Sequence, residues 1–429
     1  MINFGIAVLA LIVLVCIGIP VAYSMGLSSV IYILMVNPQY LEVLPNRSIT
    51  GVNSFLLLAI PFFVLASEIM SKTGITTKLF KFARLFAGKQ KGGMCFVNII
   101  ASTIFASVSG SAIADVSGLG KMKIQAMEDQ GYDKDFAVAL SAGTSLQSPI
   151  IPPSTTVMIY AGVMGMSAGA LLMAGVGPGI FIALTQIIYI LAIRNKRNFP
   201  VDTNVYSKKE VGQIVKDGLI TLMLPVIIIG GIMGGFVTAT EAAALAVCYA
   251  LFLGFFYYKT MKWPEFRDCL WTTCKTVGNL LLIVAFANAF SWVAAIEKVP
   301  DEIAAFLTGI SSNPLILLLI VNLFYVFVGM VMDVGAAIIL FAPIIGPVLT
   351  GVGVDPIHLG MITVINLTVG LLTPPVGLVL YTAVGVGKRP FGAVVKSFIP
   401  FIIMAYLDLL VITFFPKIST FLPYLLGLN

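Results

Sequence analysis

Two double prolines, Pro152-Pro153 and Pro374-Pro375, interrupt apolar stretches of the sequence at positions 222 residues apart. Proline lacks a backbone donor and clashes with the preceding turn, so each pair should end one half-helix and begin another. Asp133 and Asp355 stand at the same offset, which indicates a duplicated unit. Paired interruptions at matching positions of two halves are the best sequence indication of a transporter's binding site.

Composition places these breaks in a membrane. Of the 429 residues, 59% are hydrophobic and 10% are charged, whereas roughly a quarter of a soluble domain is charged. The chain is long enough for on the order of ten spans and shows none of the alternation of a β-barrel. We therefore predict an all-α polytopic membrane protein. Residues 1–20 lack a basic start and a cleavage site, so they should form a retained helix, and 4–36 crosses once or twice.

Several classes of function are excluded. The five cysteines are scattered and His358 is the only histidine, which argues against a disulfide set, a His-based metal site or a His-driven hydrolase. No phosphate-binding glycine loop is followed by Lys-Ser/Thr, which argues against an ATP-driven pump. The formal charge of +6 is attributed to cytoplasmic loops. We expect neither an enzyme, nor an organic cofactor, nor a nucleic-acid partner.

Lysine and arginine set the orientation of short loops. The segments 72–91 and 194–216 are strongly basic and should face the cytoplasm. The counterpart of the first, 296–315, carries Lys298 against three acids and should face the other side. Because equivalent segments fall on opposite sides, the two repeats should be inverted in the membrane.

Each repeat is predicted to contain a scaffold helix, a re-entrant hairpin and a Pro-broken helix. Irregular backbone at such depth is tolerable only where protein or a polar cavity satisfies its amides. The hairpins should open to opposite sides of the membrane. The predicted divisions are N-terminal scaffold helices (1–51), a first repeat (52–193, with hairpin 93–120 and broken helix 136–165), a cytoplasmic linker and scaffold pair (194–269), and a second repeat (270–429, with hairpin 315–350 and broken helix 357–387).

Five stretches together resemble a known family. They are F-L-L-L-A-I-P-F-F-V-L-A-S-E-I-M (55–70), S-G-S-A-I-A-D (109–115), I-P-P-S (151–154), T-A-T-E-A-A-A (238–244) and T-P-P-V-G (373–377). Nearly the whole chain resembles the large membrane subunit, M, of tripartite ATP-independent periplasmic (TRAP) transporters. The resemblance implies sodium-driven import of a small organic acid across the bacterial inner membrane by an elevator-like motion.

The resemblance also implies two partners, a soluble periplasmic binding protein and a small four-helix membrane subunit, Q. Because the sequence starts directly with M-type residues, we expect Q to be a separate chain. The substrate stays open among dicarboxylates, sialic acids and other sugar or keto acids, with a sialic-acid-type member as one interpretation. The alternatives are a stand-alone sodium–dicarboxylate symporter, a channel or a non-transporting membrane scaffold. The first break reads G-T-S-L-Q-S-P (143–149), where many relatives look glycine-rich, so Gln147 and Ser148 could tune this member's site.

Broken helices expose partial charges that attract ions. Unwound carbonyls, with Ser and Thr hydroxyls, are suited to Na⁺, and glycines let a carbonyl approach closely. We predict a first sodium site from Ser109, Gly110, Ser111, Ser148, Ile151 and Pro153. We predict a second from Gly329, Asp333, Gly370, Thr373 and Val376. The alternative is that these small residues only permit tight helix packing.

The half-helix that follows the first break should hold the substrate. The candidate ligands of a substrate carboxylate are hydroxyls and N-terminal amides of Ser111, Ser154, Thr155 and Thr156. Ordinary helix capping is an equally good explanation of the last three. Among the acids, Asp333 should be functional, whereas Asp115 should pair with Lys121 or Lys123.

Other polar residues are predicted to be structural. Glu241 should bond either helix ends or the partner subunit. Glu68 should lie at the end of a span, and Arg47 should lie in a solvated loop. His358 is interpreted as an incidental polar group.

Overall fold

This computed structural model describes residues 2–87, 90–202, 206–374 and 376–428. Within them the chain is helical, apart from connecting segments and one isolated antiparallel bridge between Lys91 and Val201. Eight helices of the described chain are long and apolar enough to cross a membrane: Phe55–Lys72, Ala168–Ile193, Lys208–Met233, Ala239–Tyr257, Trp263–Ile296, Pro314–Val331, Val334–Gly351 and Phe391–Phe414. The predicted all-α polytopic fold is confirmed. Of the second double proline, Pro375 lies outside the described residues.

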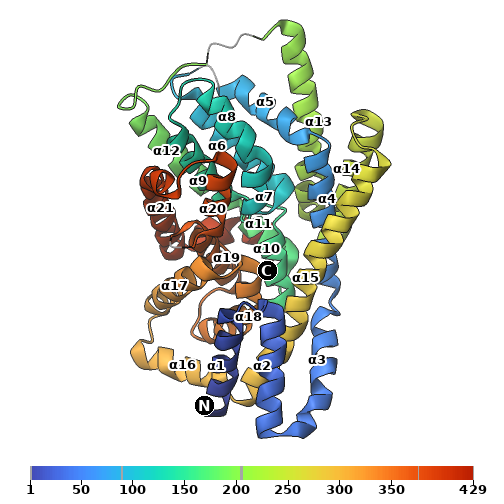
Figure 1. Cartoon of the computed structure of the whole chain (residues 1–429), viewed down its shortest axis with the longest axis vertical. Helices are drawn as coiled ribbons and strands as arrows, with labels where there is room; N and C mark the ends of the chain where they lie inside the picture. The colour runs from blue at the N-terminus through green and yellow to red at the C-terminus, as the bar shows by residue number, and fades with distance from the viewer. Residues whose placement is uncertain (1, 88–89, 203–205, 375, 429) are drawn as a thin grey trace.

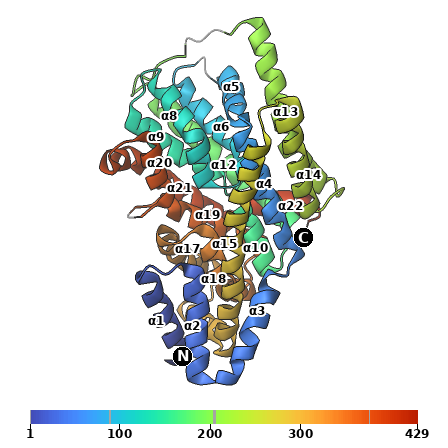
Figure 2. The same ribbon diagram turned by 45° about the vertical axis from the view of Figure 1, so that its right-hand side comes forward.

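The N-terminal region folds as two helices. These are α1 (Ile2–Cys16) and α2 (Val21–Val36), which lie side by side at one end of the molecule (Figures 1 and 2). The chain reverses between them at Gly18, whose φ of 96° suits glycine. A 3₁₀ turn then leads into α3 (Val43–Val52). Arg47, expected in a loop, lies on α3, with its guanidinium carbon 6.0 Å from the centre of the Trp292 ring.

One very long helix organises the first group of helices. This is α15 (Trp263–Ile296), which runs along the molecule and packs against α2, α3 and α4 (Figures 1 and 2). The group is completed by α4 (Ala59–Lys72), α5 (Ile75–Ala87), α13 (Lys208–Met233), α14 (Ala239–Leu251) and α16 (Val299–Ile310). We call these helices, with α1 to α3, the scaffold.

The second group contains both breaks, and we call it the core body. Its first half consists of α6 (Gly93–Ser109), α7 (Ala112–Asp115), a π-helical turn (Val116–Gly120), α8 (Lys121–Glu128), α9 (Lys134–Thr144), α10 (Thr155–Met164), α11 (Ala168–Ala174) and α12 (Val176–Ile193). Its second half consists of α17 (Pro314–Val331), α18 (Val334–Gly351), α19 (Pro356–Leu372), α20 (Leu378–Gly387), α21 (Phe391–Phe414) and α22 (Lys417–Leu425). Asp133 and Asp355 are equivalent N-caps, since each carboxylate accepts a backbone N–H of α9 or α19.

Two segments expected as loops contain helices. The basic segment 72–91 contains α5, and its counterpart 296–315 contains α16. In α5 the basic residues alternate with an apolar face, and Ile75, Leu79 and Ala83 are buried at helical spacing. Figure 1 places α5 and α16 toward opposite ends of the long axis. That placement is the one an inverted arrangement requires, while membrane sidedness stays a prediction.

Ion pairs fasten the basic end of the molecule. Arg84 on α5 grips Asp202 with two hydrogen bonds, of 2.6 and 3.1 Å, and Lys78 lies 3.0 Å from the carboxylate of Asp217 on α13. Beside the first pair, the amide of Gly92 donates to the carbonyl of Pro200 over 3.1 Å. The two chain segments that join scaffold to core body at this end, before α6 and after α12, are thereby held together.

Candidate ion and substrate site between two hairpin tips

The first hairpin turns at Gly110, directly against the first break. Gly110 has a φ of 62°, and a Cβ there would lie only 2.6 Å from the carbonyl oxygen of Pro153. The hydroxyl of Thr155 donates to the carbonyl of Gly110 over 3.2 Å. The structure therefore brings Gly110 and Pro153 together with backbone packed on backbone, as the sequence predicts, and it also brings the hydroxyl of Thr155 to this tip.

Hydroxyl groups within the first break form hydrogen bonds to its backbone. Thr156 donates to the carbonyl of Pro149 over 2.9 Å, and the hydroxyl of Ser154 donates to the same carbonyl. Ser154 also accepts the amide of Val157 over 3.1 Å and is fully buried, so it acts as the N-cap of α10. Of the predicted substrate ligands in this stretch, Thr155 and Thr156 line the adjoining cavity and Ser154 does not.

The remaining residues of the predicted first sodium site differ in the atoms that could bind an ion. Ser148 is fully buried, and its hydroxyl has no hydrogen-bond partner among the described residues. Ile151 points its side chain toward α12, where a Cβ on Gly179 would meet it at 2.2 Å, so only its backbone could bind an ion. Ser109 and Ser111 are at the tip, where the hydroxyl of Ser109 lies 3.3 Å from the carbonyl of Ser111. The unpaired, buried hydroxyl oxygen of Ser148 suits a cation.

The second hairpin and the second break meet in the same way. A Cβ on Gly370 would lie 2.6 Å from the Cα of Gly329, so these two glycines bring the backbones of α17 and α19 into contact. The hydroxyl of Thr373 donates to the carbonyl of Val369 over 2.8 Å and lies 2.9 Å from the hydroxyl of Tyr406. Val376 is 37% exposed. Thr373 therefore already has protein partners, which the sequence could not show.

Asp333 lines a cavity that the other predicted residues of the second site do not line. Its carboxylate caps α18 by accepting the amide of Gly335 over 2.9 Å, and it lines a cavity shared with the first tip. This cavity, of about 440 Å³, is where both tips, the first break and the scaffold meet. The core body contributes the stretches 109–114 and 333–335 with Pro149, Thr155, Thr156, Ile159 and Leu371, and the scaffold contributes Val64, Ser67, Glu68, Thr276, Asn279, Leu280 and Ile283.

The scaffold wall of the cavity was missed by sequence reasoning. Glu68, expected at the end of a span, faces the cavity from α4, and Thr276 and Asn279 face it from α15. The available signal was polar side chains inside long apolar helices, which are usually functional. Among the described lining residues two are acidic and none is basic. The cavity therefore carries formal negative charge before any ligand enters.

Two other acids have structural partners. Asp115 is paired with Lys123, at 3.2 Å, rather than with Lys121. Glu241 forms a reciprocal capping box with Thr238 at the start of α14, as a structural role predicts. His358 is buried, and its Nδ1 lies 2.8 Å from the hydroxyl of Ser419.

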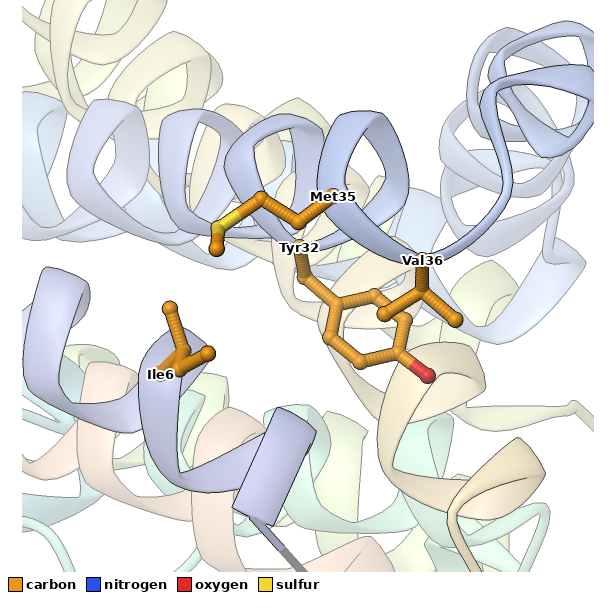
Figure 3. A pocket seen from close by; sticks show the side chains of 4 residues that line it. All are labelled: Ile6, Tyr32, Met35 and Val36. Carbon is orange, nitrogen blue, oxygen red and sulfur yellow. The ribbon is translucent and has the colours of Figure 1, made fainter.

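A separate cavity between α1 and α2 is a poor candidate for an anion site. It measures about 240 Å³ and is lined by Ile6, Tyr32, Met35 and Val36 (Figure 3). Its one polar side chain, Tyr32, donates its hydroxyl to the carboxylate of Glu297. Unlike this cavity, the cavity at the tips has convergent hydroxyls, helix starts and carboxylates.

Known proteins resemble this chain over nearly its full length. The family described as "Tripartite ATP-independent periplasmic transporter, DctM component" matches residues 8–418. The sialic acid TRAP transporter large permease protein of Vibrio cholerae is 36% identical over 95% of both chains, and the C4-dicarboxylate TRAP transporter large permease protein of Pseudomonas aeruginosa is 35% identical over 95% of both. The isethionate TRAP transporter permease protein of Oleidesulfovibrio alaskensis is 34% identical over 97% of this chain and 65% of its own length.

Among solved structures, the fold is similar to that of the Alcanivorax borkumensis YdaH transporter. The TM-score is 0.67 at 13% sequence identity, with 92% of this chain and 91% of that one covered. With the eight apolar helices, these relatives make the chain a multi-pass protein of the bacterial inner membrane. It belongs to the DctM family, the large permease component of the tripartite ATP-independent periplasmic transporters.

Proposed function

We propose that this chain imports a small organic acid together with sodium, binding both at the cavity between the two hairpin tips. The observation that carries the proposal is the composition of that cavity. Hydroxyls of the first tip and of α10 face two carboxylates, and no basic side chain is among the described lining residues. The motion proposed is an elevator-like displacement of the core body against the scaffold.

The start of α10 supports binding of a carboxylate. Thr155 and Thr156 occupy its first turn and line the cavity. The free amides and the dipole of a helix N-terminus favour negative charge, and hydroxyls can donate to carboxylate oxygens. This wall of the cavity can therefore hold an anion without an arginine.

The acids of the cavity support the co-transport of cations. Glu68 and Asp333 would repel an anionic substrate in a partly dehydrated cavity, where charges interact more strongly than in water. Sodium ions bound by the tip carbonyls and by Ser148 would offset this repulsion. Substrate binding would then depend on sodium, and the dependence would be reciprocal.

The relatives suggest candidates for the substrate. Proteins named for sialic acid, C4-dicarboxylates and isethionate are 36, 35 and 34% identical to this chain. These identities are too similar to favour one of the three substrates. The cavity volume lies within the usual range for small organic ligands, roughly 300–1,000 Å³. All three are organic acids, so we propose that chemical class.

The family description, a tripartite periplasmic transporter, supports two partners. We propose a periplasmic binding protein that delivers the acid and a small membrane subunit of the Q type. The test is uptake of radiolabelled sialic acid, succinate and isethionate into proteoliposomes under an inward sodium gradient. The samples contain this chain alone, with a small subunit of the Q type, or with both that subunit and a periplasmic binding protein.

Uptake of one acid is expected only with both partners and only with sodium outside. Robust sodium-driven uptake by the single chain would establish a stand-alone symporter instead. Passive equilibration of solutes without sodium would indicate a channel. Uptake unchanged when choline replaces sodium would refute the sodium coupling.

A further inference from the structure

An ion pair is completely buried in the core body, outside the cavity. Lys123 on α8 and Asp115 at the end of α7 are both 0% exposed. The ammonium nitrogen of Lys123 lies 3.2 and 3.3 Å from the two carboxylate oxygens of Asp115. It also lies 2.6 Å from the hydroxyl of Ser102 and 3.5 Å from the hydroxyl of Thr144. Four oxygens therefore surround one monovalent cation.

These oxygens come from separate parts of the fold. Ser102 is on α6, Asp115 and Lys123 flank the π-helical turn, and Thr144 ends α9 just before the first break. The hydroxyl of Thr144 donates to Asn98 over 3.0 Å, and Asn98 donates to Ser141 over 2.9 Å. The ammonium thus joins both legs of the first hairpin to the half-helix that leads into the break.

The second repeat is built without this pair. The counterparts of Asp115 and Lys123, 222 residues later, are Ala337 and Ile345. The counterpart of Thr144 is Asn366, which is fully buried and whose side-chain oxygen has no hydrogen-bond partner among the described residues. The lysine is therefore no requirement of the hairpin fold. In the first repeat, the ammonium of Lys123 compensates the charge of the buried Asp115 carboxylate.

We propose that the first repeat contains a third cation position, separate from the two at the tips, and that the ammonium of Lys123 occupies it permanently. If so, removal of the ammonium alone leaves a vacancy lined by two carboxylate oxygens and two hydroxyls. A sodium ion should enter it, because sodium binds to oxygen ligands and its charge would balance the buried carboxylate.

The test measures thermal unfolding of the full chain in detergent, in sodium chloride and in choline chloride of equal ionic strength. Lys123→Ala is expected to be destabilised in choline and to regain stability in sodium. Its sodium-dependent shift in Tm should exceed that of the parent by about 2 °C or more. The matched control is Lys121→Ala, which removes a neighbouring lysine on the exposed side of α8 and should respond to sodium as the parent does.

Two further variants separate a vacancy from general damage. Asp115→Asn keeps the ammonium and should be destabilised in both salts, with no added response to sodium. Lys123→Met combined with Asp115→Asn removes both charges and should lose the added response. A sodium response of Lys123→Ala equal to that of the parent would overturn the proposal, as would failure of this variant to fold in sodium. The readout is stability relative to the parent, so it does not depend on transport or on sodium at the tips.

Discussion

At Gly110 the first hairpin tip packs against the first break so closely that there is no room for a Cβ atom. The φ of 62° at Gly110 is strained for any residue with a side chain, and the nearest obstacle is the carbonyl oxygen of Pro153, which belongs to backbone and cannot rotate away. The same carbonyl is a predicted sodium ligand. A change at Gly110 should therefore affect ion binding before it affects the fold elsewhere.

Gly110→Ala is expected to abolish most sodium-dependent uptake by pushing the tip away from Pro153. Left-handed backbone alone costs alanine about 1–2 kcal/mol. The matched control is Gly131→Ala, because Gly131 has a φ of 85° but a Cβ there would meet no atom within 4 Å. The control should lose stability only. Equal uptake by the two variants, at matched expression, would mean that the tip contact has no role in transport.

For Thr373, predicted from the sequence as a sodium ligand, the structure adds a competing structural role. Its hydroxyl bonds to Val369 and Tyr406, so a structural role competes with the predicted role as a sodium ligand. Loss of a neutral hydrogen bond costs about 1 kcal/mol, whereas loss of a ligand to a charge costs about 1.5–3 kcal/mol. Thr373→Ala should therefore weaken the apparent sodium affinity about tenfold to a hundredfold if the hydroxyl binds the ion.

Tyr406→Phe is the control for that experiment, since it breaks the same contact and keeps the threonine. Uptake is measured against sodium concentration for both variants and the parent. A shift in Thr373→Ala alone assigns the hydroxyl to the ion. Equal curves for all three proteins would remove Thr373 from the site.

At the scale of elements, one ion pair joins the two broken helices. Arg389, just after α20, grips Asp135 in the first turn of α9 through two hydrogen bonds, of 2.6 and 3.0 Å. These bonds to the guanidinium lower the pKa of Asp135. Because the native pKa lies below the unfolded one, the pair stabilises the fold above the ordinary pKa of aspartate, about 3.9. That stabilisation is lost as the pH falls through the lowered value.

Asp135→Asn is therefore expected to lower the thermal midpoint at neutral pH, and the difference from the parent should shrink below a pH of about 4. The pair is partly exposed, so added salt should also reduce the difference. Thermal unfolding in detergent over a pH series at two ionic strengths measures both effects. A difference that stays constant through acid pH would show that the carboxylate charge does not contribute.

The elements that sequence predicted well are those marked by local chemistry. Glycine, serine and proline inside apolar runs located both tips and both breaks, because these residues disrupt helices wherever they stand. The helix α5 was missed as an element because its lysines were counted as loop charges, although its buried residues recur at helical spacing. Lys123 could not be chosen over Lys121, because the intervening π-helical turn changes which residues share a face with Asp115.

The scaffold wall of the cavity could not be derived in the same way. Glu68 and Asn279 belong to helices whose cavity-facing side is decided by packing against the two tips, which are distant in sequence. A polar residue inside a span indicates that some polar neighbour exists without identifying it. The partner of Thr373 was hidden for the same reason, since Tyr406 lies on α21.

At the scale of the whole molecule, the inverted arrangement predicts on which side each connection lies. In a cysteine-free background, Gly212→Cys on α13 should be labelled only from the cytoplasm, and Ser312→Cys before α17 only from the periplasm. Both positions are exposed, and a Cβ on Gly212 would meet no atom within 4 Å. An impermeant maleimide added to sealed cells tests both. Labelling of both residues from the outside would rule out the inversion.

The elevator proposal requires the core body to slide past the scaffold. The two meet where Leu57, just before α4, faces Gly162 on α10, and a Cβ on Gly162 would lie 3.3 Å from the Cγ of Leu57. A cysteine pair at these positions should cross-link and stop uptake, and a reductant should restore it. The control pair is Val138→Cys with Gly387→Cys, whose Cβ atoms would lie 3.5 Å apart, at the short end of the usual spacing in a disulfide.

That control pair joins α9 to α20, which both belong to the core body, so its cross-link should leave uptake intact because the body moves as one piece. Uptake before oxidation, after oxidation and after reduction is measured for both pairs, with cross-linking followed by mobility on gels after cleavage between the two cysteines of each pair. Full uptake by a completely cross-linked Leu57→Cys, Gly162→Cys protein would show that substrate crosses without relative motion at this interface. Loss of uptake in both pairs would place the essential motion inside the core body, at the breaks themselves.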